Sequence, residues 1–238
     1  MIIRPQYMNT LKTYRDVPLV KILAGIRRCG KSTILDMLRD DLLKSGIAAD
    51  HIISMRYTSE DFDDGMTDKD MYNGIKEKMT DDERYYLLLD EAFDGLDVVI
   101  RKALKGILVD GVTARGMTTV IASHNLRELE DLCDSVGLVH NGHMVLSDEV
   151  DKLKGNLHKV QAAFRGVPDV TAFSGLDVIK AERSGSLLQL IVRGDEIQIM
   201  NYINRLSPVF SECIEPSLEE TFMFELEVNG YDVKSIAE

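Results

Sequence analysis

The stretch Gly25-Ile26-Arg27-Arg28-Cys29-Gly30-Lys31-Ser32 matches the pattern G-x-x-x-x-G-K-[ST] at every fixed position. An apolar run at residues 19–24 precedes it and predicts a buried strand. A helical pattern to about Lys44 follows, with apolar residues at 34, 35, 38 and 42. This strand–loop–helix order is the context that the pattern requires, so the stretch predicts a phosphate-binding loop.

The two fixed glycines explain how such a loop binds anions. Gly25 and Gly30 permit backbone conformations that other residues resist, so that successive N–H groups can face one phosphate. The following helix adds the partial positive charge of its N-terminus. We expect Lys31 to reach the β- and γ-phosphates of ATP, and the hydroxyl of Ser32 to ligate Mg²⁺. The residues expected to line the triphosphate are Gly25, Ile26, Arg27, Arg28, Cys29, Gly30, Lys31, Ser32 and Thr33.

Two carboxylates end a second apolar strand, in the sequence Leu87-Leu88-Leu89-Asp90-Glu91. A buried carboxylate is costly unless it has a partner, so Asp90 is expected to orient Mg²⁺ or its water. Glu91 is then the residue expected to polarise the attacking water. His124 directly follows the strand predicted at 118–123, where it could reach the γ-phosphate or be an ordinary polar loop residue.

Strands alternate with helices along residues 1–155, and β-branched runs without polar alternation favour a mostly parallel sheet. The pattern also predicts a helix over 125–133, a hairpin turn at Asn141-Gly142 and a helix capped by Ser147 that ends near Gly155. We therefore expect an α/β fold: a P-loop NTPase core with helices flanking the sheet (1–155). A small α+β C-terminal domain is expected to follow (156–238).

The composition is that of an ordinary globular protein, with 45% hydrophobic and 29% charged residues. No apolar run approaches the roughly 20 residues that span a bilayer, so we expect a cytoplasmic location. The net charge of −12 gives no support to nucleic-acid binding. The three cysteines lack the paired spacing of a disulfide framework or a metal site.

From about Tyr86 onward, the sequence resembles the ATP-binding subunit of ABC transporters. Residues 88–97 resemble the Walker B strand with its D-loop, 123–131 the switch-histidine segment, and 216–222 the tail of bacterial exporter ATPases. The resemblance implies Asp90 for Mg²⁺, Glu91 as catalytic base and His124 at the γ-phosphate. It also implies a homodimer contact near Asp97 and a membrane permease partner, which would hold the chain peripherally at the inner face of the cell membrane.

Residues 1–91 instead resemble a bacterial or archaeal AAA-type ATPase with an R-R-x-G-K-[ST] loop. In that family the two nucleotide motifs lie close together, as here, where Asp90 follows Lys31 by 59 residues (90 − 31). An ABC subunit needs roughly twice that distance, and residues 33–89 contain no L-S-G-G-Q-like signature or helical subdomain. The chain therefore resembles a join of two P-loop families, whose origin the sequence leaves open.

Three functions follow as hypotheses. The first is an ABC-like ATPase that binds ATP and hydrolyses it slowly to ADP and phosphate. The second is an AAA-type ATPase with a foreign C-terminal half, for which Arg101 and Arg115 are conceivable sources of an arginine contributed to a neighbouring subunit. The third is a non-catalytic nucleotide-binding or inactive chain. Whether hydrolysis is retained, and which substrate is transported, stay open.

Overall fold

A computed structural model describes residues 15–25, 29–56, 68–91, 98–127, 129–140, 143–155, 157–166 and 168–228. The chain divides into two compact units, Met1–Glu149 and Val150–Glu238. The boundary lies six residues before the expected one, because the short helix α6 (Val150–Lys154) packs within the second unit, against α8 (Leu218–Val228). No helix in the described ranges is both long enough and apolar enough to cross a bilayer.

The first unit is built on a six-stranded sheet in the order β2-β3-β4-β1-β5-β6. Its strands are β1 (Val20–Ala24), β2 (Ile52–Arg56), β3 (Tyr86–Asp90), β4 (Thr118–Ser123), β5 (Ser135–His140) and β6 (His143–Glu149). Neighbouring strands are parallel except β5 and β6, which form the expected antiparallel hairpin. The expected α/β fold with a mostly parallel sheet is confirmed.

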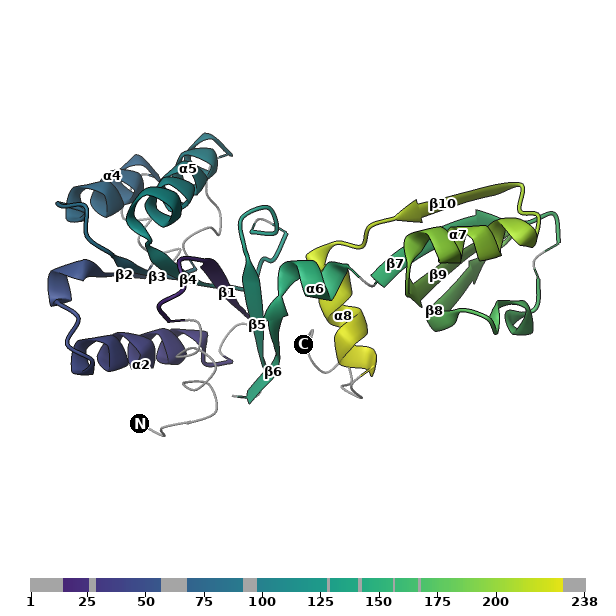
Figure 1. Cartoon of the computed structure of the whole chain (residues 1–238), viewed down its shortest axis with the longest axis horizontal. Helices are drawn as coiled ribbons and strands as arrows, with labels where there is room; N and C mark the ends of the chain where they lie inside the picture. Colours follow the sequence, from purple (N-terminus) through teal and green to yellow (C-terminus); the bar gives the residue numbers. More distant parts are fainter. Residues whose placement is uncertain are drawn as a thin grey trace. The chain divides into compact units, whose positions relative to one another are not determined.

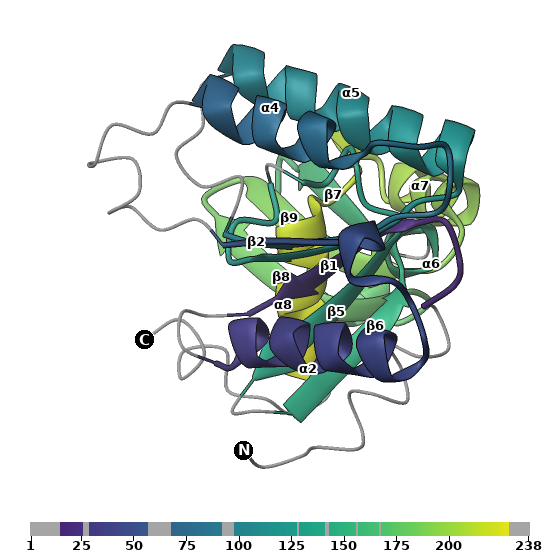
Figure 2. The ribbon, with the colours of Figure 1, turned by 90° about the vertical axis from the view of Figure 1, so that its left-hand side faces the viewer.

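Helices cover both faces of this sheet (Figures 1 and 2). Helix α2 (Lys31–Lys44) lies on one face, and α4 (Asp68–Lys78) and α5 (Val98–Arg115) lie on the other. A 3-10 turn, η1 (Ala49–His51), leads into β2. The α2 side chains Ile34, Leu35, Leu38 and Leu42 join buried residues of β1 to β4 in one core cluster. The helical periodicity therefore identified the buried face of α2 correctly.

Two sequence expectations about the first unit are wrong. The segment 125–133 is not a helix among its described residues: it is a series of turns, with Leu129 N–H donating to the Leu126 carbonyl. Leu126 and Leu129 are nevertheless buried, so their helix-like spacing reflects anchoring of a return loop. Ser147 lies within β6 rather than capping a helix, because β6 pairs with β5 as far as Glu149. The turn residues 141 and 142 lie outside the described residues.

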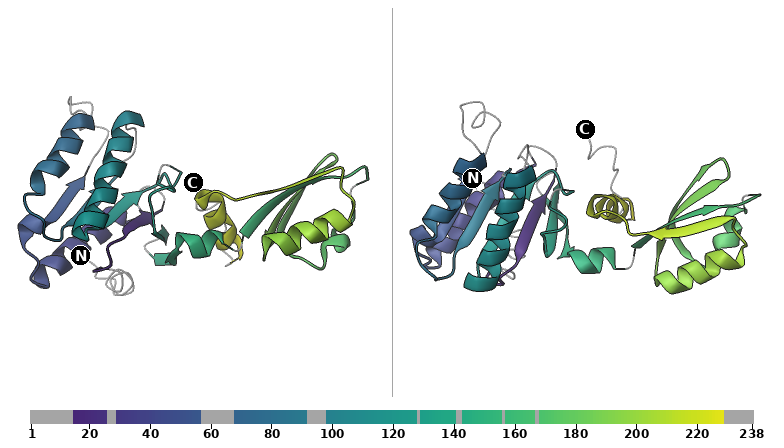
Figure 3. Two further views of the ribbon diagram at one scale, coloured as in Figure 1. Left: turned by 45° about the horizontal axis from the view of Figure 1, so that its top comes forward. Right: turned by 90° about the horizontal axis from the view of Figure 1, so that it is seen from above.

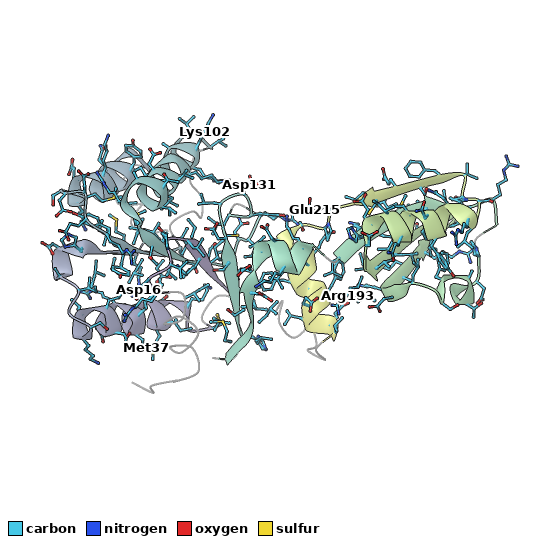
Figure 4. The ribbon with its side chains drawn as sticks, in the orientation of Figure 1. Asp16, Met37, Lys102, Asp131, Arg193 and Glu215 are labelled. Carbon is cyan, nitrogen blue, oxygen red and sulfur yellow. The ribbon has the colours of Figure 1, made fainter. Side chains whose placement is uncertain are left out.

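The second unit is built on a four-stranded antiparallel sheet in the order β10-β7-β9-β8 (Figure 3). Its elements are β7 (Leu157–Ala163), η2 (Val170–Phe173), β8 (Asp177–Ser184), β9 (Leu187–Arg193), α7 (Glu196–Arg205) and β10 (Phe210–Ile214), followed by α8. One core cluster joins inward-facing residues of β7 and β9 to Ile199 and Ile203 of α7. Arg193, labelled in Figure 4, binds Glu225 of α8 at 2.6 Å.

Lys21 on the central strand β1 is a buried base, with 5% of its surface exposed. Its Nζ donates to the carbonyls of Val17 (2.9 Å) and Leu19 (3.3 Å). Each of these carbonyls also accepts another hydrogen bond. The Val17 carbonyl accepts from Thr118 Oγ1, and the Leu19 carbonyl accepts from the Thr119 N–H. Burial lowers the pKa of Lys21 from 10.5 to about 8.

Because of this lowered pKa, the free energy of unfolding should change with pH in the alkaline range. Between pH 8 and 10.5 the unfolded chain binds more protons than the folded one, so the free energy of unfolding rises with pH. The rise amounts to at most about 3 kcal/mol. Urea unfolding at pH 8, 9 and 10 should show this rise in wild type and in Lys44→Met, an exposed control. Lys21→Met should lack it, and an unchanged rise in that variant would refute the assignment.

Candidate nucleotide site

The two fixed glycines of the phosphate-binding loop adopt conformations that disfavour any other residue. A Cβ atom on Gly25 would lie 2.3 Å from the Val139 carbonyl oxygen and 2.7 Å from Cys29 Sγ. Gly30, the residue that precedes α2, has φ +103°. Such a conformation is strained for residues with a Cβ. Gly25 thus lies close beside β5, and Gly30 leads directly into the α2 N-terminus, where helix N–H groups can bind an anion.

Lys31, the first residue of α2, is only 4% exposed. Its Nζ donates to the Gly25 carbonyl at 2.8 Å and lies 3.3 Å from Glu91 Oε1. A buried ammonium requires such partners because desolvation penalises an unpaired charge. The lysine therefore links the loop after β1 to the end of β3, two strands that β4 separates.

Glu91 adopts a left-handed backbone conformation, with φ +54°. This conformation is uncommon for residues other than glycine. Its N–H donates to the Ala122 carbonyl of β4 at 2.9 Å, which holds the backbone in place. Its Oε2 lies 2.9 Å from His124 Nδ1. Lys31, Glu91 and His124 therefore form a continuous polar chain across the carboxyl ends of the parallel strands.

Asp90 is the buried end of β3, with 3% of its surface exposed. Its Oδ2 accepts from Arg56 Nε at 2.9 Å, whereas Oδ1 is buried and has no hydrogen-bond partner among the described residues. An oxygen in this state suits a hydrated Mg²⁺, which proteins hold through one or two carboxylates together with phosphates. Ser32 is half-buried in the first turn of α2. These groups fit the expected metal.

The structure brings Gly25, Lys31, Asp90, Glu91 and His124 to one edge of the sheet. Of the other expected phosphate-binding residues, Cys29 and Gly30 lead into α2, and Thr33 is exposed on its first turn. Burial raises the pKa of the Cys29 thiol, which favours its neutral form. Ile26, Arg27 and Arg28 lie outside the described residues, as does Asp97.

Arg56 also contacts these groups, and the sequence interpretation missed it. The only signal available was its position at the end of a predicted strand, because its pairing with Asp90 depends on the parallel register of β2 and β3.

The close approach of Gly25 to β5 predicts a specific mutational sensitivity. Gly25→Ala should lower the free energy of unfolding by about 2 kcal/mol or more, since the added methyl overlaps the Val139 carbonyl. The matched control is Gly106→Ala within α5, where an added Cβ meets nothing within 4 Å. It should stabilise by about 0.5–1 kcal/mol. Equal urea midpoints for the two variants would contradict this geometry.

Comparisons with known proteins agree with both resemblances. A family described as "AAA domain" matches residues 18–131. The ABC transporter ATP-binding protein YtrB of Bacillus subtilis is 27% identical over 138 residues, which are 58% of this chain and 47% of YtrB. The lantibiotic transport ATP-binding protein SrtF of Streptococcus pyogenes is 31% identical over 147 residues, which are 62% of this chain and 57% of SrtF. The chain thus spans about half the length of these relatives.

A solved structure of cbiO1 from Clostridium perfringens, part of the ABC transporter complex cbiONQ, is 15% identical with a TM-score of 0.45. That similarity covers 57% of this chain and 79% of cbiO1. The AAA match continues past the join expected at residues 86–91 and includes both nucleotide motifs. The chain therefore has the fold of P-loop NTPases, and its sequence resembles both AAA-type ATPases and the ATP-binding subunits of ABC transporters.

Proposed function

We propose that this chain binds Mg·ATP at the loop between β1 and α2 and hydrolyses it slowly. The observation that carries the proposal is the polar chain from Lys31 through Glu91 to His124. It joins an ammonium suited to phosphate, a carboxylate suited to water and an imidazole within one short path. All three groups lie where the parallel strands end, which is the usual ligand edge of such sheets.

The proposed chemistry uses each residue in a distinct way. When ATP binds, the Lys31 ammonium leaves Glu91 and contacts the β- and γ-phosphates. The α2 N-terminus binds the same anion. That exchange frees Glu91 Oε1 to accept a proton from the attacking water. His124 stays beside Glu91 and donates to the γ-phosphate. Ser32 and Asp90 would hold Mg²⁺, which would supply charge neutralisation at the phosphate oxygens.

We propose slow turnover because the sequence between the two nucleotide motifs lacks an ABC signature segment. In ABC subunits a second copy closes that segment over the γ-phosphate, so a homodimer of this chain would lack the contribution. The Asp97 region is the proposed homodimer contact. A membrane permease is the proposed partner, which would place the chain peripherally at the inner face of the cell membrane. The names of YtrB and SrtF as transport ATP-binding proteins support this partner class.

An AAA-type ATPase is the second candidate, favoured by the match of the AAA family across residues 18–131. Such an enzyme needs an arginine from a neighbouring subunit. Arg115, in the last turn of α5, lies 3.6 Å from Asp82 of its own chain, which fits a surface ion pair better than such a role. An ATP-dependent ring in light scattering would favour this candidate, and a monomer or dimer with ATP would favour the first.

ATP binding predicts ligand-dependent stability. At about 100 times its dissociation constant, Mg·ATP should stabilise the folded chain by about 2.7 kcal/mol. Thermal melting with and without Mg·ATP measures this change. Lys31→Ala should abolish the shift, because it removes the ammonium that faces the phosphates. A wild-type melting temperature that Mg·ATP leaves unchanged would refute the proposal and favour a non-catalytic role.

Hydrolysis should depend on Glu91. Glu91→Gln should lower the slow phosphate release by about 100-fold or more, because general-base catalysis contributes at least that factor. Its binding of Mg·ATP should persist, since Lys31 leaves residue 91 and contacts the phosphates when the nucleotide binds. Glu77→Gln, an exposed change on α4, should leave turnover as in wild type. Brisk, cooperative hydrolysis by the purified wild-type chain without a partner would contradict the proposed slow rate.

A further inference from the structure

Arg56 ends strand β2, next to the two carboxylates that end β3. The parallel register pairs Arg56 directly with Asp90. Its side chain is half-exposed, at 53%, whereas that of Asp90 is only 5% exposed. The guanidinium therefore reaches from solvent toward a buried carboxylate at the ligand edge of the sheet.

Two carboxylates on different elements bind this guanidinium. Arg56 Nε donates to Asp90 Oδ2 at 2.9 Å. A terminal nitrogen donates to both oxygens of Asp36 on α2, at 3.2 and 3.4 Å. The planar fork of arginine suits such bridging, because its donors point in fixed directions. Arg56 thus ties α2 to the end of β3.

This bridge lies beside both residues that are proposed to hold the metal, Ser32 and Asp90. Asp36 lies four residues after Ser32, so both occupy the same face of α2. The bridge therefore couples the helical turn that carries the Ser32 hydroxyl to the carboxylate of Asp90. It occupies Oδ2 and leaves Oδ1, buried and without a hydrogen-bond partner among the described residues, as the acceptor that remains.

We propose that Arg56 is a positioning residue for magnesium: it fixes Asp90 so that Oδ1 faces the metal and its waters. This inference rests on the proposed Mg·ATP function. Groups that orient metal ligands typically change metal affinity by about 10- to 100-fold. The role is distinct from phosphate binding, because the bridge runs from α2 to β3 without using the phosphate loop.

A cation beside a metal site also repels the metal, and this effect would act in the opposite direction. Here Asp36 offsets it, since the carboxylate of Asp36 neutralises the guanidinium at 3.2 Å. The net charge that Arg56 and Asp36 together present to Mg²⁺ is close to zero. Arg56→Gln leaves Asp36 uncompensated and so adds attraction for Mg²⁺, whereas Arg56→Lys keeps the charge. We expect the lost orientation of Asp90 to outweigh this added attraction, so that loss of Arg56 weakens magnesium binding.

The test measures the Mg²⁺ concentration that half-saturates binding of a fluorescent ATP analogue. Arg56→Gln should raise this concentration by about tenfold. Affinity for the analogue in EDTA should stay within about twofold of wild type. Asp36→Ala should shift the midpoint in the same direction, and the double variant should be no worse than Arg56→Gln alone, as expected for one coupled unit. Arg39→Gln, an exposed change on α2, is the charge-matched control and should behave as wild type.

Each other outcome is decisive. An unchanged midpoint in Arg56→Gln would show an ordinary surface ion pair, and a lowered midpoint would show competition with the metal; either overturns the proposal. If Arg56→Gln melts well below wild type, Arg56→Lys provides the same comparison, because a single ammonium cannot span both carboxylates and the midpoint should still rise. Absence of analogue binding by wild type at any Mg²⁺ concentration would instead refute the proposed nucleotide function.

Discussion

The buried ammonium of Lys31 is the constraint on which the rest of the candidate site depends. At 4% exposure it must find anionic or carbonyl partners, and it finds them at Gly25 and Glu91. These partners come from the ends of β1 and β3, on either side of β4. The sheet order and register, with Ala24 beside Ser123 and Asp90 beside Ala122, bring them within reach. The strand order and register of the sheet therefore allow the buried charge of Lys31 to be paired.

The same arrangement pairs the buried charges of the site. Lys31 is paired with Glu91, and Asp90 with Arg56, so that the buried charges have opposite partners. Incoming phosphates would replace Glu91 as the partner of Lys31, whereas a metal would bind Asp90 Oδ1, the oxygen that Arg56 does not contact. The nucleotide would thereby release Glu91 toward water while Arg56 continues to hold Asp90. Exchange of the Lys31 partner would thereby couple nucleotide binding to catalysis.

Local sequence signals predicted the elements that carry the site, and tertiary register determined what those signals missed. The phosphate loop, the strand ending in Asp90 and the buried face of α2 follow from spacing and apolar periodicity. The contact of Arg56 with Asp90 does not follow from these signals, because it forms only when β2 lies beside β3. The turns after His124 were mistaken for a helix because Leu126 and Leu129 have helical spacing. The left-handed backbone of Glu91 has no sequence signal of its own.

We infer that Lys31 changes partners when nucleotide binds. A crystal structure of the chain with Mg²⁺ and a non-hydrolysable ATP analogue tests it most directly. The account predicts the triphosphate between Gly25 and the α2 N-terminus, with Lys31 Nζ on phosphate oxygens and no longer within 3.3 Å of Glu91 Oε1. A bound nucleotide elsewhere, with Lys31 still on the Gly25 carbonyl and on Glu91, would contradict the account.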